Sequence, residues 1–400
     1  MTVTLADIQA AADRIRGHVE RTPCRLSRRL SEATGAEVWI KFENLHYTSS
    51  FKERGARNAL EQLSPEERAR GVVTASAGNH ASALARHASL LGAPCTIVMP
   101  VGTPSVKVEK SEGLGATVVI HGSGYEESVA RAREIEAAEG RVFVHGFDNA
   151  AIVAGAGTCA LEMLEDAPDL DDLVVPIGGA GLIAGCAVAA KALRPGIRVV
   201  GVEAAMYPSF LARREGRTVE CGGPTLAEGI AIKKIGDIPF EVADPLIDDI
   251  LIVDEPDFEE AVAMFATVEK TVAEGAGAGG LAALLRHPKR FAGRKVGVVL
   301  CGGNIDTRLL ASVLNRELVR ERRLVTFRIV HDDRPGMLAA MTSAIAEAGG
   351  NIVDVVHNRL ALQIPAKSTE YLIQIETRGA EHDEAIASAL RSKGYALETS

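Results

Sequence analysis

Lys52 is the residue in this sequence best suited to covalent chemistry. It stands in segment 48–56, between Phe51 and a Gly55-Ala56 step, just after a strand expected over residues 38–42. A lysine that forms a Schiff base needs a partly dry pocket, because desolvation disfavours the ammonium form. The neighbouring aromatic ring and small side chains would supply such walls. Most lysines that open a helix are solvated, so this segment alone leaves an ordinary surface role open.

A second candidate site is the loop Gly178-Gly179-Ala180-Gly181-Leu182. It follows an apolar run at 173–177 and precedes an expected helix at 182–193. Backbone N–H groups of such a loop bind an anion at a helix N-terminus without any basic side chain. A tight turn is the alternative interpretation. The loop is not a Walker loop, because no Lys-Ser/Thr pair follows, and it fits a dinucleotide fingerprint only in a loose form.

Two further motifs follow expected strands. Ser76-Ala77-Gly78-Asn79-His80 offers hydroxyl, amide and N–H donors to a carboxylate, with a helix N-cap and a satisfied histidine as the structural alternative. Cys301 precedes Gly302-Gly303-Asn304, and an isolated cysteine at such a position more often packs inertly than takes part in chemistry. The segment 274–278 is interpreted as a helix boundary.

The elements that must position these motifs alternate between strand and helix. The first series has strands expected at 72–75, 96–99, 117–120 and 142–144, with helices at 81–91, 105–114 and 125–138. The second has strands at 173–177, 199–203, 250–253 and 296–300, with helices at 182–193, 257–273 and 279–286. This alternation predicts an α/β fold of two stacked parallel-sheet units, with a ligand at the carboxyl ends of their strands. A capping box at Thr4 and Asp7 opens a first helix whose apolar positions continue to Val19.

The composition changes after residues 321–323. A strand at 324–330, a helix at 337–348, strands at 353–362 and 369–376, a helix at 382–393 and a strand at 396–399 follow. This βαββαβ order is typical of a ferredoxin-like domain. We therefore expect one domain over residues 1–320, with a smaller subdomain at about 48–145, and a second domain over residues 324–400.

Composition limits the partners and the compartment. The 400 residues carry a net charge of −9 without a Lys/Arg-rich block, which argues against nucleic acid and anionic membrane surfaces. The first residues lack the pattern of a signal peptide, and no apolar run reaches membrane-spanning length. The six cysteines are scattered without a CxxC pair, which argues against zinc and disulfides and for a reducing cytoplasm.

Taken together and in this order, the motifs at 50–56, 76–81, 178–182, 274–278 and 301–306 resemble the threonine/serine dehydratases, which are pyridoxal-phosphate enzymes of fold type II. The resemblance covers roughly residues 5–317. Residues 324–400, with the segments 332–338 and 350–352, resemble a single ACT regulatory domain.

The resemblance implies roles for individual residues. Lys52 would be the Schiff-base lysine and the base that removes the Cα proton, and Phe51 would flank the cofactor ring. Asn79 would bind the ring's 3′-oxygen, and Ser76, Ala77, Gly78, Asn79 and His80 would hold the substrate carboxylate. The loop from Gly178 to Leu182 would cradle the phosphate, and Cys301 would face the pyridine nitrogen.

The second domain has an implied role of its own. In related ACT domains an amino acid binds between paired subunits, and the matching positions here are Asp332, Arg334, Gly336, Met337, Leu338 and Asn351. We expect a homodimer or homotetramer and a branched-chain effector, isoleucine or valine.

Two positions depart from the pattern of relatives. Ala180 stands where they often have glycine, and its methyl group restricts φ. The segment after Glu203 lacks the second carboxylate with which some relatives bind a divalent cation, so we expect no metal there.

The resemblance implies conversion of L-threonine to 2-oxobutanoate and ammonia, with L-serine as a second substrate. A serine racemase or a serine-specific dehydratase of the same fold is the alternative. Serine racemases carry a serine at the position of Ala77, and its hydroxyl works from the opposite face of the ring. Two other classes remain open on the motifs alone. One is a nucleotide-dependent oxidoreductase using the loop at 178–185, and the other is an amino-acid-sensing binding protein.

Overall fold

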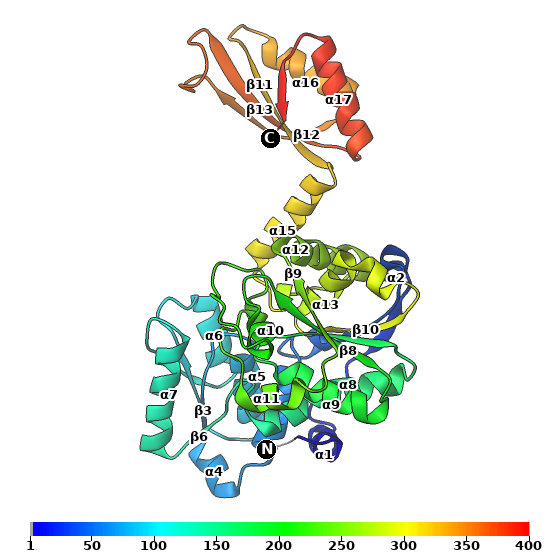
Figure 1. The fold of residues 1–400 in the computed structure, drawn as a ribbon. Helices are drawn as coiled ribbons and strands as arrows, with labels where there is room; N and C mark the ends of the chain where they lie inside the picture. Colours follow the sequence, from blue (N-terminus) through cyan, green and yellow to red (C-terminus); the bar gives the residue numbers. More distant parts are fainter. Residues whose placement is uncertain (1–2, 400) are drawn as a thin grey trace. The chain divides into compact units, whose positions relative to one another are not determined.

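The computed structural model describes residues 3–399. The chain divides into two compact units, the first ending at Ile305 and the second beginning at Asp306. Within residues 3–399 there are three β-sheets, two in the first unit and one in the second. Both units are drawn in Figure 1. No helix of the described residues is long and apolar enough to cross a bilayer.

The larger sheet of the first unit has six strands in the order β1-β2-β10-β7-β8-β9. They are β1 (Cys24–Ser27), β2 (Glu37–Phe42), β7 (Asp172–Pro176), β8 (Arg198–Ala204), β9 (Asp249–Val253) and β10 (Lys295–Leu300). Only β1 runs antiparallel to its neighbour in these pairings. The central strands are almost entirely buried, as expected when helices cover both faces of a parallel sheet.

The smaller sheet has four parallel strands in the order β5-β4-β3-β6. They are β3 (Val72–Ala75), β4 (Cys95–Met99), β5 (Thr117–Ile120) and β6 (Val142–Phe143). The chain begins in the six-stranded sheet, builds the smaller sheet, and then returns to complete the larger one. The expectation of two parallel-sheet α/β units is confirmed.

Helices surround these two sheets (Figure 1). They are α1 (Leu5–Ile15), α2 (Arg28–Thr34), α3 (Lys52–Glu61), α4 (Pro65–Arg70), α5 (Asn79–Leu90), α6 (Ser105–Gly113), α7 (Tyr125–Glu139), α8 (Ala150–Asp166), α9 (Gly181–Leu193), α10 (Ser209–Arg214), α11 (Asp237–Ala243), α12 (Glu255–Met264), α13 (Gly275–Arg286) and α14 (Pro288–Phe291), with short turns η1 (Glu43–Leu45), η2 (Glu228–Ile230) and η3 (Phe265–Glu269). Glycines let α3, α8 and α9 pack backbone to backbone. An ideal Cβ on Gly155 would lie 2.6 Å from the carbonyl oxygen of Arg54, and one on Gly185 would lie 2.3 Å from that of Val153.

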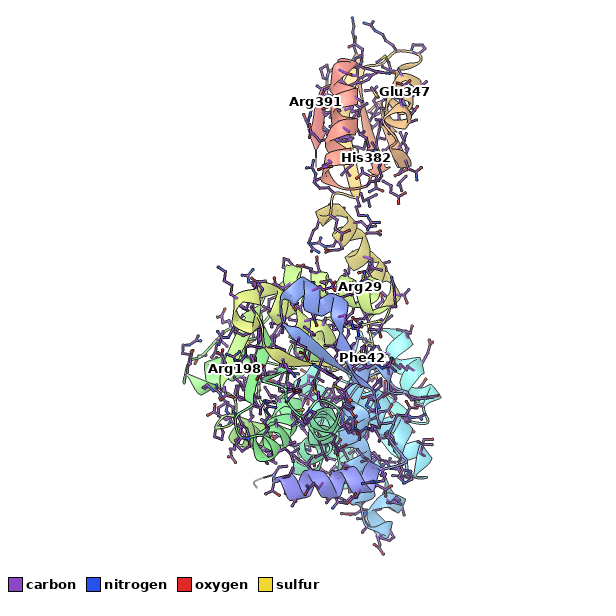
Figure 2. All side chains as sticks on the ribbon, turned by 90° about the vertical axis from the view of Figure 1, so that its right-hand side faces the viewer. Arg29, Phe42, Arg198, Glu347, His382 and Arg391 are labelled. Carbon is purple, nitrogen blue, oxygen red and sulfur yellow. The ribbon has the colours of Figure 1, made fainter. Side chains whose placement is uncertain are left out.

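The second unit has a sheet in the order β12-β13-β11-β14, which is the ferredoxin-like arrangement expected of an ACT domain. Its elements are α15 (Thr307–Arg320), β11 (Leu324–Asp332), α16 (Met337–Glu347), β12 (Asn351–Asn358), β13 (Ser368–Glu376), α17 (Ala380–Ser392) and β14 (Leu397–Thr399). Helices α16 and α17 pack on one face of this sheet (Figure 1). His382, labelled in Figure 2, donates from Nε2 to the carbonyl oxygen of Ala348 at 2.9 Å and ties α17 to the end of α16.

Several predicted boundaries need correction. The capping box of α1 is present, but the helix ends at Ile15 rather than running to Val19, because Gly17 adopts a left-handed φ of 75°. The predicted helix 257–273 also ends early, at Met264. A π-helical turn follows, and the Asn44 side chain holds the next segment by donating to Thr271 Oγ1 and to the carbonyl oxygen of Val272. Helix α13 starts at residue 275 rather than 279, and the sequence did not predict β1 or α8. The boundary between the two domains stays a prediction.

Adding one methyl group at Gly185 should destabilise the first unit, because the backbone of α8 already occupies the space that a Cβ needs. We expect Gly185→Ala to lose about 1–3 kcal/mol of unfolding free energy, the usual cost of overpacking. Gly113→Ala is the matched control, since Gly113 sits in a helix and nothing lies within 4 Å of the position that a Cβ would take there. Urea denaturation checks both variants, and equal midpoints for Gly185→Ala and the parent chain would contradict the packing argument.

Candidate active site

The loops that follow β2 and β10 are hydrogen-bonded to each other at the edge of the six-stranded sheet. Phe51 N donates to the carbonyl oxygen of Cys301 at 3.1 Å, and Gly303 N donates to that of Ser49 at 2.9 Å. The two strands are parallel neighbours, so their carboxyl ends meet at one edge. Lys52 and Cys301, 249 positions apart in the chain, are thereby brought into one site.

Lys52 is the first residue of α3 and is half-buried. Its Nζ donates to the carbonyl oxygen of Gly146 at 2.7 Å and lies 4.9 Å from the centroid of the Phe51 ring. Burial lowers the pKa of Lys52 to about 8, against the opposing effect of Cys301 and Glu274. The neutral amine is therefore accessible near neutral pH, as the dry-pocket argument requires.

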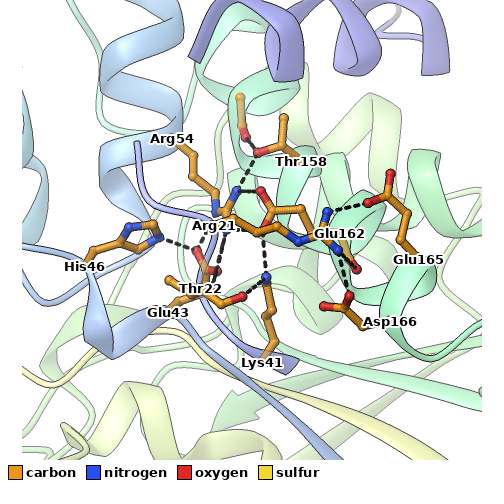
Figure 3. A network of polar contacts seen from close by, with 11 residues as sticks. Arg21, Thr22, Lys41, Glu43, His46, Arg54, Thr158, Glu162, Glu165 and Asp166 are labelled. Atoms are coloured by element: carbon orange, nitrogen blue, oxygen red, sulfur yellow. Dashed lines mark hydrogen bonds and ion pairs between the residues drawn. The ribbon is translucent and has the colours of Figure 1, made fainter. Parts of the chain in front are cut away.

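A buried ionic network fixes the helix that carries Lys52 (Figure 3). The Arg54 guanidinium is fully buried and donates to both carboxylate oxygens of Glu43, at 2.6 and 2.8 Å, and to both of Glu162, at 2.7 and 2.8 Å. Lys41 Nζ donates to Glu162 and to the carbonyl oxygen of Thr22, each at 2.6 Å. Burial opposes ionisation of Glu43, but Arg54 and His46 outweigh it and hold the pKa of Glu43 well below its usual range. Two cations thus face two carboxylates beneath the site.

The glycine-rich loop ends at the start of α9. Ala180 is the N-cap of this helix and has a φ of 70°, a left-handed conformation that costs a non-glycine residue free energy. The first N–H groups of a helix lack partners within it and point toward an incoming anion. A Cβ on Gly179 would lie 2.2 Å from the ring of Phe147, which packs against the loop.

Asn79 begins α5 and lies between two polar residues from elsewhere in the chain. Its Nδ2 donates to Glu274 Oε1 at 2.8 Å, and its Oδ1 accepts from Asn304 Nδ2 at 2.7 Å. Burial raises the pKa of Glu274 to about 7. A Cβ on Gly302 would lie 2.3 Å from Glu274 Oε1, so this glycine makes room for the contact.

The rest of the 76–80 segment turns from β3 into α5. Ser76 N donates to the carbonyl oxygen of Val98 at 3.1 Å, and its Oγ accepts from Gly78 N at 3.3 Å. Ala77 is half-buried, and Gly78 is exposed, with open space where a Cβ would stand. His80 is buried, and its Nε2 donates to the carbonyl oxygen of Val144 at 3.0 Å. Burial, helped by Lys52, lowers the pKa of His80 to about 3, so this histidine is neutral.

Cys301 is buried, and its thiol donates to the carbonyl oxygen of Ala276 at 3.6 Å. Burial, followed by the nearby Glu274, raises the pKa of Cys301 well above its ordinary value. The group at this position is therefore a neutral thiol rather than a thiolate.

Sequence reasoning missed four contributors to the site: Gly146, Phe147, Glu274 and Asn304. The first two lie on the loop after β6, which supplies the acceptor for Lys52 and the ring against the glycine loop. Glu274 is the N-cap of α13, as the helix-boundary interpretation implies, but it also reaches Asn79. A lone carboxylate in a run of glycine and alanine was the signal that could have identified it.

The segment after Glu203 is where the sequence analysis expects no metal ion. The carboxylate of Glu203 is buried and accepts from Phe210 N at 2.7 Å and from Leu211 N at 3.0 Å, at the start of α10. Burial raises the pKa of Glu203 to about 7. Among residues 3–399, no group of three or more His, Cys, Asp and Glu side chains is arranged to hold a metal ion. That no metal acts here stays a prediction.

The candidate effector residues fall at two ends of the second unit. Asp332 ends β11 and accepts from Arg334 at 2.8 Å, and Gly336 caps α16, which begins with Met337 and Leu338. Asn351 starts β12 opposite Glu376, which in turn pairs with Leu324 at the far end of β11. Eight residues of strand, or about 27 Å at 3.4 Å per residue, separate the two levels. One copy of the chain therefore does not bring Asn351 to the loop at 332–338.

The site suits the expected cofactor. Lys52 is an amine in a partly dry pocket beside an aromatic ring, the start of α9 offers backbone donors to a phosphate, and Asn79 offers an amide N–H. The Ser50 hydroxyl, two residues before the lysine, is fully buried without a hydrogen-bond partner in the described structure. A polar ligand at this position would relieve that cost.

Comparisons with known proteins agree with this geometry. Residues 15–302 match the family described as "Pyridoxal-phosphate dependent enzyme", and residues 325–394 match the ACT domain. The chain is 43% identical over 395 residues to an L-threonine ammonia-lyase of Thermotoga maritima. This alignment covers 98% of each of the two proteins. The structure of maize serine racemase aligns with a TM-score of 0.74 and 32% identity, covering 80% of this chain and 100% of that one. Threonine deaminase isoform 2 of Solanum lycopersicum aligns with a TM-score of 0.73 and 31% identity, covering 78% of this chain and 91% of that one.

Proposed function

The chain belongs to the family of pyridoxal-phosphate-dependent enzymes, and we propose that it is an ammonia-lyase that converts L-threonine to 2-oxobutanoate and ammonia and also acts on L-serine. One observation carries the proposal most directly. The Lys52 amine has a lowered pKa and lies beside the Phe51 ring, in the same unit as the glycine loop at the start of α9 and a buried neutral thiol. The six cysteines all fall in the described residues and are free, which supports a reducing, cytoplasmic setting.

Each residue of the site has a task in this proposal. Bound pyridoxal phosphate supplies an electron sink that stabilises negative charge on the α-carbon of an amino acid. Lys52 removes the proton from that carbon, for which its pKa of about 8 is well placed. The backbone at 178–182 would hold the phosphate, the segment 76–80 would hold the substrate carboxylate, and Asn79 would bind the ring oxygen.

Cys301 tunes the chemistry through its protonation state. If the pyridine ring of the cofactor binds beside Cys301, as the resemblance implies, the neutral thiol would not keep the ring nitrogen protonated as an aspartate would. The ring would then be a weaker electron sink, which would suit loss of a β-hydroxyl group better than transamination.

Replacing Lys52 by alanine removes the amine while leaving the buried network of Arg54 untouched. We expect Lys52→Ala to keep the circular-dichroism spectrum of the parent chain, to lose the visible absorbance of the cofactor-loaded protein, and to release no 2-oxobutanoate above background. Stopped assays with L-threonine and a spectrum before and after borohydride measure this. Substantial ammonia release by a folded Lys52→Ala protein would refute the assignment.

Elimination and racemisation are separated by Ala77. Racemisation needs acid or base groups on both faces of a planar carbanion, whereas elimination needs a base on one face only. Lys52 serves one face, and Ala77 has no proton to exchange from the other. This residue favours the lyase over the serine racemase that the fold also allows.

We expect the parent chain to convert L-serine to oxo acid and ammonia with negligible D-serine, and Ala77→Ser to raise the racemised fraction. Ala77 is half-buried in the loop between β3 and α5, and serine is larger than alanine by one hydroxyl group. Chiral chromatography of the residual amino acid measures the fraction. D-serine formed by the parent chain as fast as ammonia would show that the chain is a racemase instead.

The ACT domain supports a proposal about regulation. The candidate effector residues lie at opposite ends of the unit in one chain, so a site that uses both ends needs a second copy. We propose a homodimer or homotetramer in which isoleucine or valine binds between two ACT domains and alters threonine affinity.

We expect isoleucine or valine to change the KM for threonine by about 5–150-fold, which corresponds to a coupling of about 1–3 kcal/mol. The control is a chain that ends at Glu321, which lacks β11 to β14 and should not respond. Light scattering gives the oligomeric state of both proteins. An equal response in both chains, or no response to any common amino acid, would contradict the regulatory role.

A further inference from the structure

A chain of four side chains runs from the surface into the candidate active site. Lys110 Nζ, on α6, donates to Asn304 Oδ1 at 2.6 Å. Asn304 Nδ2 donates to Asn79 Oδ1 at 2.7 Å, and Asn79 Nδ2 donates to Glu274 Oε1 at 2.8 Å. Every bond points the same way, from the ammonium toward the carboxylate, so the bonds polarise one another.

Two groups that have only one hydrogen-bonding role set this direction. The Lys110 ammonium can only donate, and the carbonyl oxygen of Thr48 can only accept. Asn304 Nδ2 donates to that carbonyl oxygen at 2.7 Å. Asn304 must therefore present its oxygen to Lys110 and its amino group to Asn79. Asn79 in turn must present its oxygen to Asn304, which leaves its amino group facing Glu274 with one N–H to spare. The amide of Asn79 is thus held in one of its two orientations.

The chain of side chains also joins two parts of the first unit. Along the sequence, helix α6 connects β4 and β5 of the smaller sheet, whereas Asn304 follows β10 of the larger sheet. A second contact links the same helix to the larger part: Lys107 Nζ meets Glu228 Oε2 at 3.1 Å, three positions earlier on α6. That pair is exposed and does not touch Asn79.

We propose that Lys110 and Asn304 are positioning residues, which orient the Asn79 amide so that its spare N–H meets the bound ligand when α6 lies against the loop after β10. The inference rests on the proposed function, because that function makes Asn79 a contact of the cofactor ring. Neither residue touches the reacting atoms, and both act through Asn79. Removing the Asn304 donor lets the Asn79 amide turn, and removing Lys110 loosens Asn304.

The test measures cofactor binding and its spectrum in the full-length protein. Apo-protein is titrated with pyridoxal phosphate, and the dissociation constant and the visible absorption band are recorded for Asn304→Asp, Lys110→Met and Lys110→Arg. Lys107→Met is the matched control, because it removes the same charge and a contact of the same helix without entering the chain of side chains.

We expect Asn304→Asp to weaken cofactor binding by about tenfold or more and to shift the visible band, since an aspartate cannot donate to Asn79 Oδ1. Lys110→Met should weaken binding by about three- to tenfold with a smaller shift, as expected for the loss of one partly exposed charged donor. Lys110→Arg and Lys107→Met should stay within about twofold of the parent chain. Lys110 is at the surface, so its variants keep the test available if Asn304→Asp folds poorly.

Two results would overturn the inference. One is a dissociation constant and visible band unchanged in Asn304→Asp and Lys110→Met. The other is a Lys107→Met protein that changes as much as Lys110→Met, which would point to surface charge alone. Failure of the proposed function is distinguishable, because the parent chain itself would then take up no cofactor or release no ammonia from L-threonine.

Discussion

The arrangement of the first unit depends on the buried ion pairs that the Arg54 guanidinium forms with Glu43 and Glu162. The guanidinium joins η1, α3 and α8 in one buried network, together with Lys41 from β2 (Figure 3). Buried ion pairs gain little net stability over apolar packing, but removing one partner leaves an uncompensated charge and is costly. The network therefore matters for the position of α3 more than for net stability. Its ion pairs form in one placement of α3 on α8, and this placement also sets the position of Lys52, two residues before Arg54. The glycine contacts of α8 with α3 and α9 set the depth of the same packing.

The path of the chain explains why the site forms where it does. Strands β2, β7 and β10 are neighbours in the six-stranded sheet, although the whole smaller sheet is inserted between the first two in sequence. Their carboxyl ends carry the lysine loop, the glycine loop and the cysteine loop. The segments after β3 and β6 of the smaller sheet bring Asn79 and Gly146 to the same place. Ligand binding at strand carboxyl ends is general in α/β folds, and here two sheets contribute to one site.

Local patterns in the sequence predicted the parts of the site that depend on local structure. Apolar runs identified the central strands, and the glycine loop identified the start of α9, because burial and backbone conformation leave marks within a few residues. Helix α8 was missed because it is apolar on nearly all faces and lacks the amphipathic period of a surface helix. The end of α12 was wrong because Asn44, more than 200 positions away, holds the following segment. Glu274 and Asn304 lie in motifs that the sequence analysis names, but their hydrogen bonds to Asn79 were missed because only the folded chain brings the three residues together.

Burial also determines the charge of the site. It lowers the pKa of Lys52 and His80 and raises the pKa of Glu274 and Cys301, so each group is pushed toward its neutral form. In such an environment the fixed dipoles at the start of α9 act more strongly than they would in water. The charges that matter are then those that a ligand brings, a phosphate and an amino-acid carboxylate, and backbone donors can meet them without a basic side chain that would compete with Lys52. Lys110 fits this scheme because its charge stays at the surface, and only its hydrogen bonds reach inward through Asn304 and Asn79. A site built this way keeps an amine reactive near neutral pH in a protein whose net charge is −9.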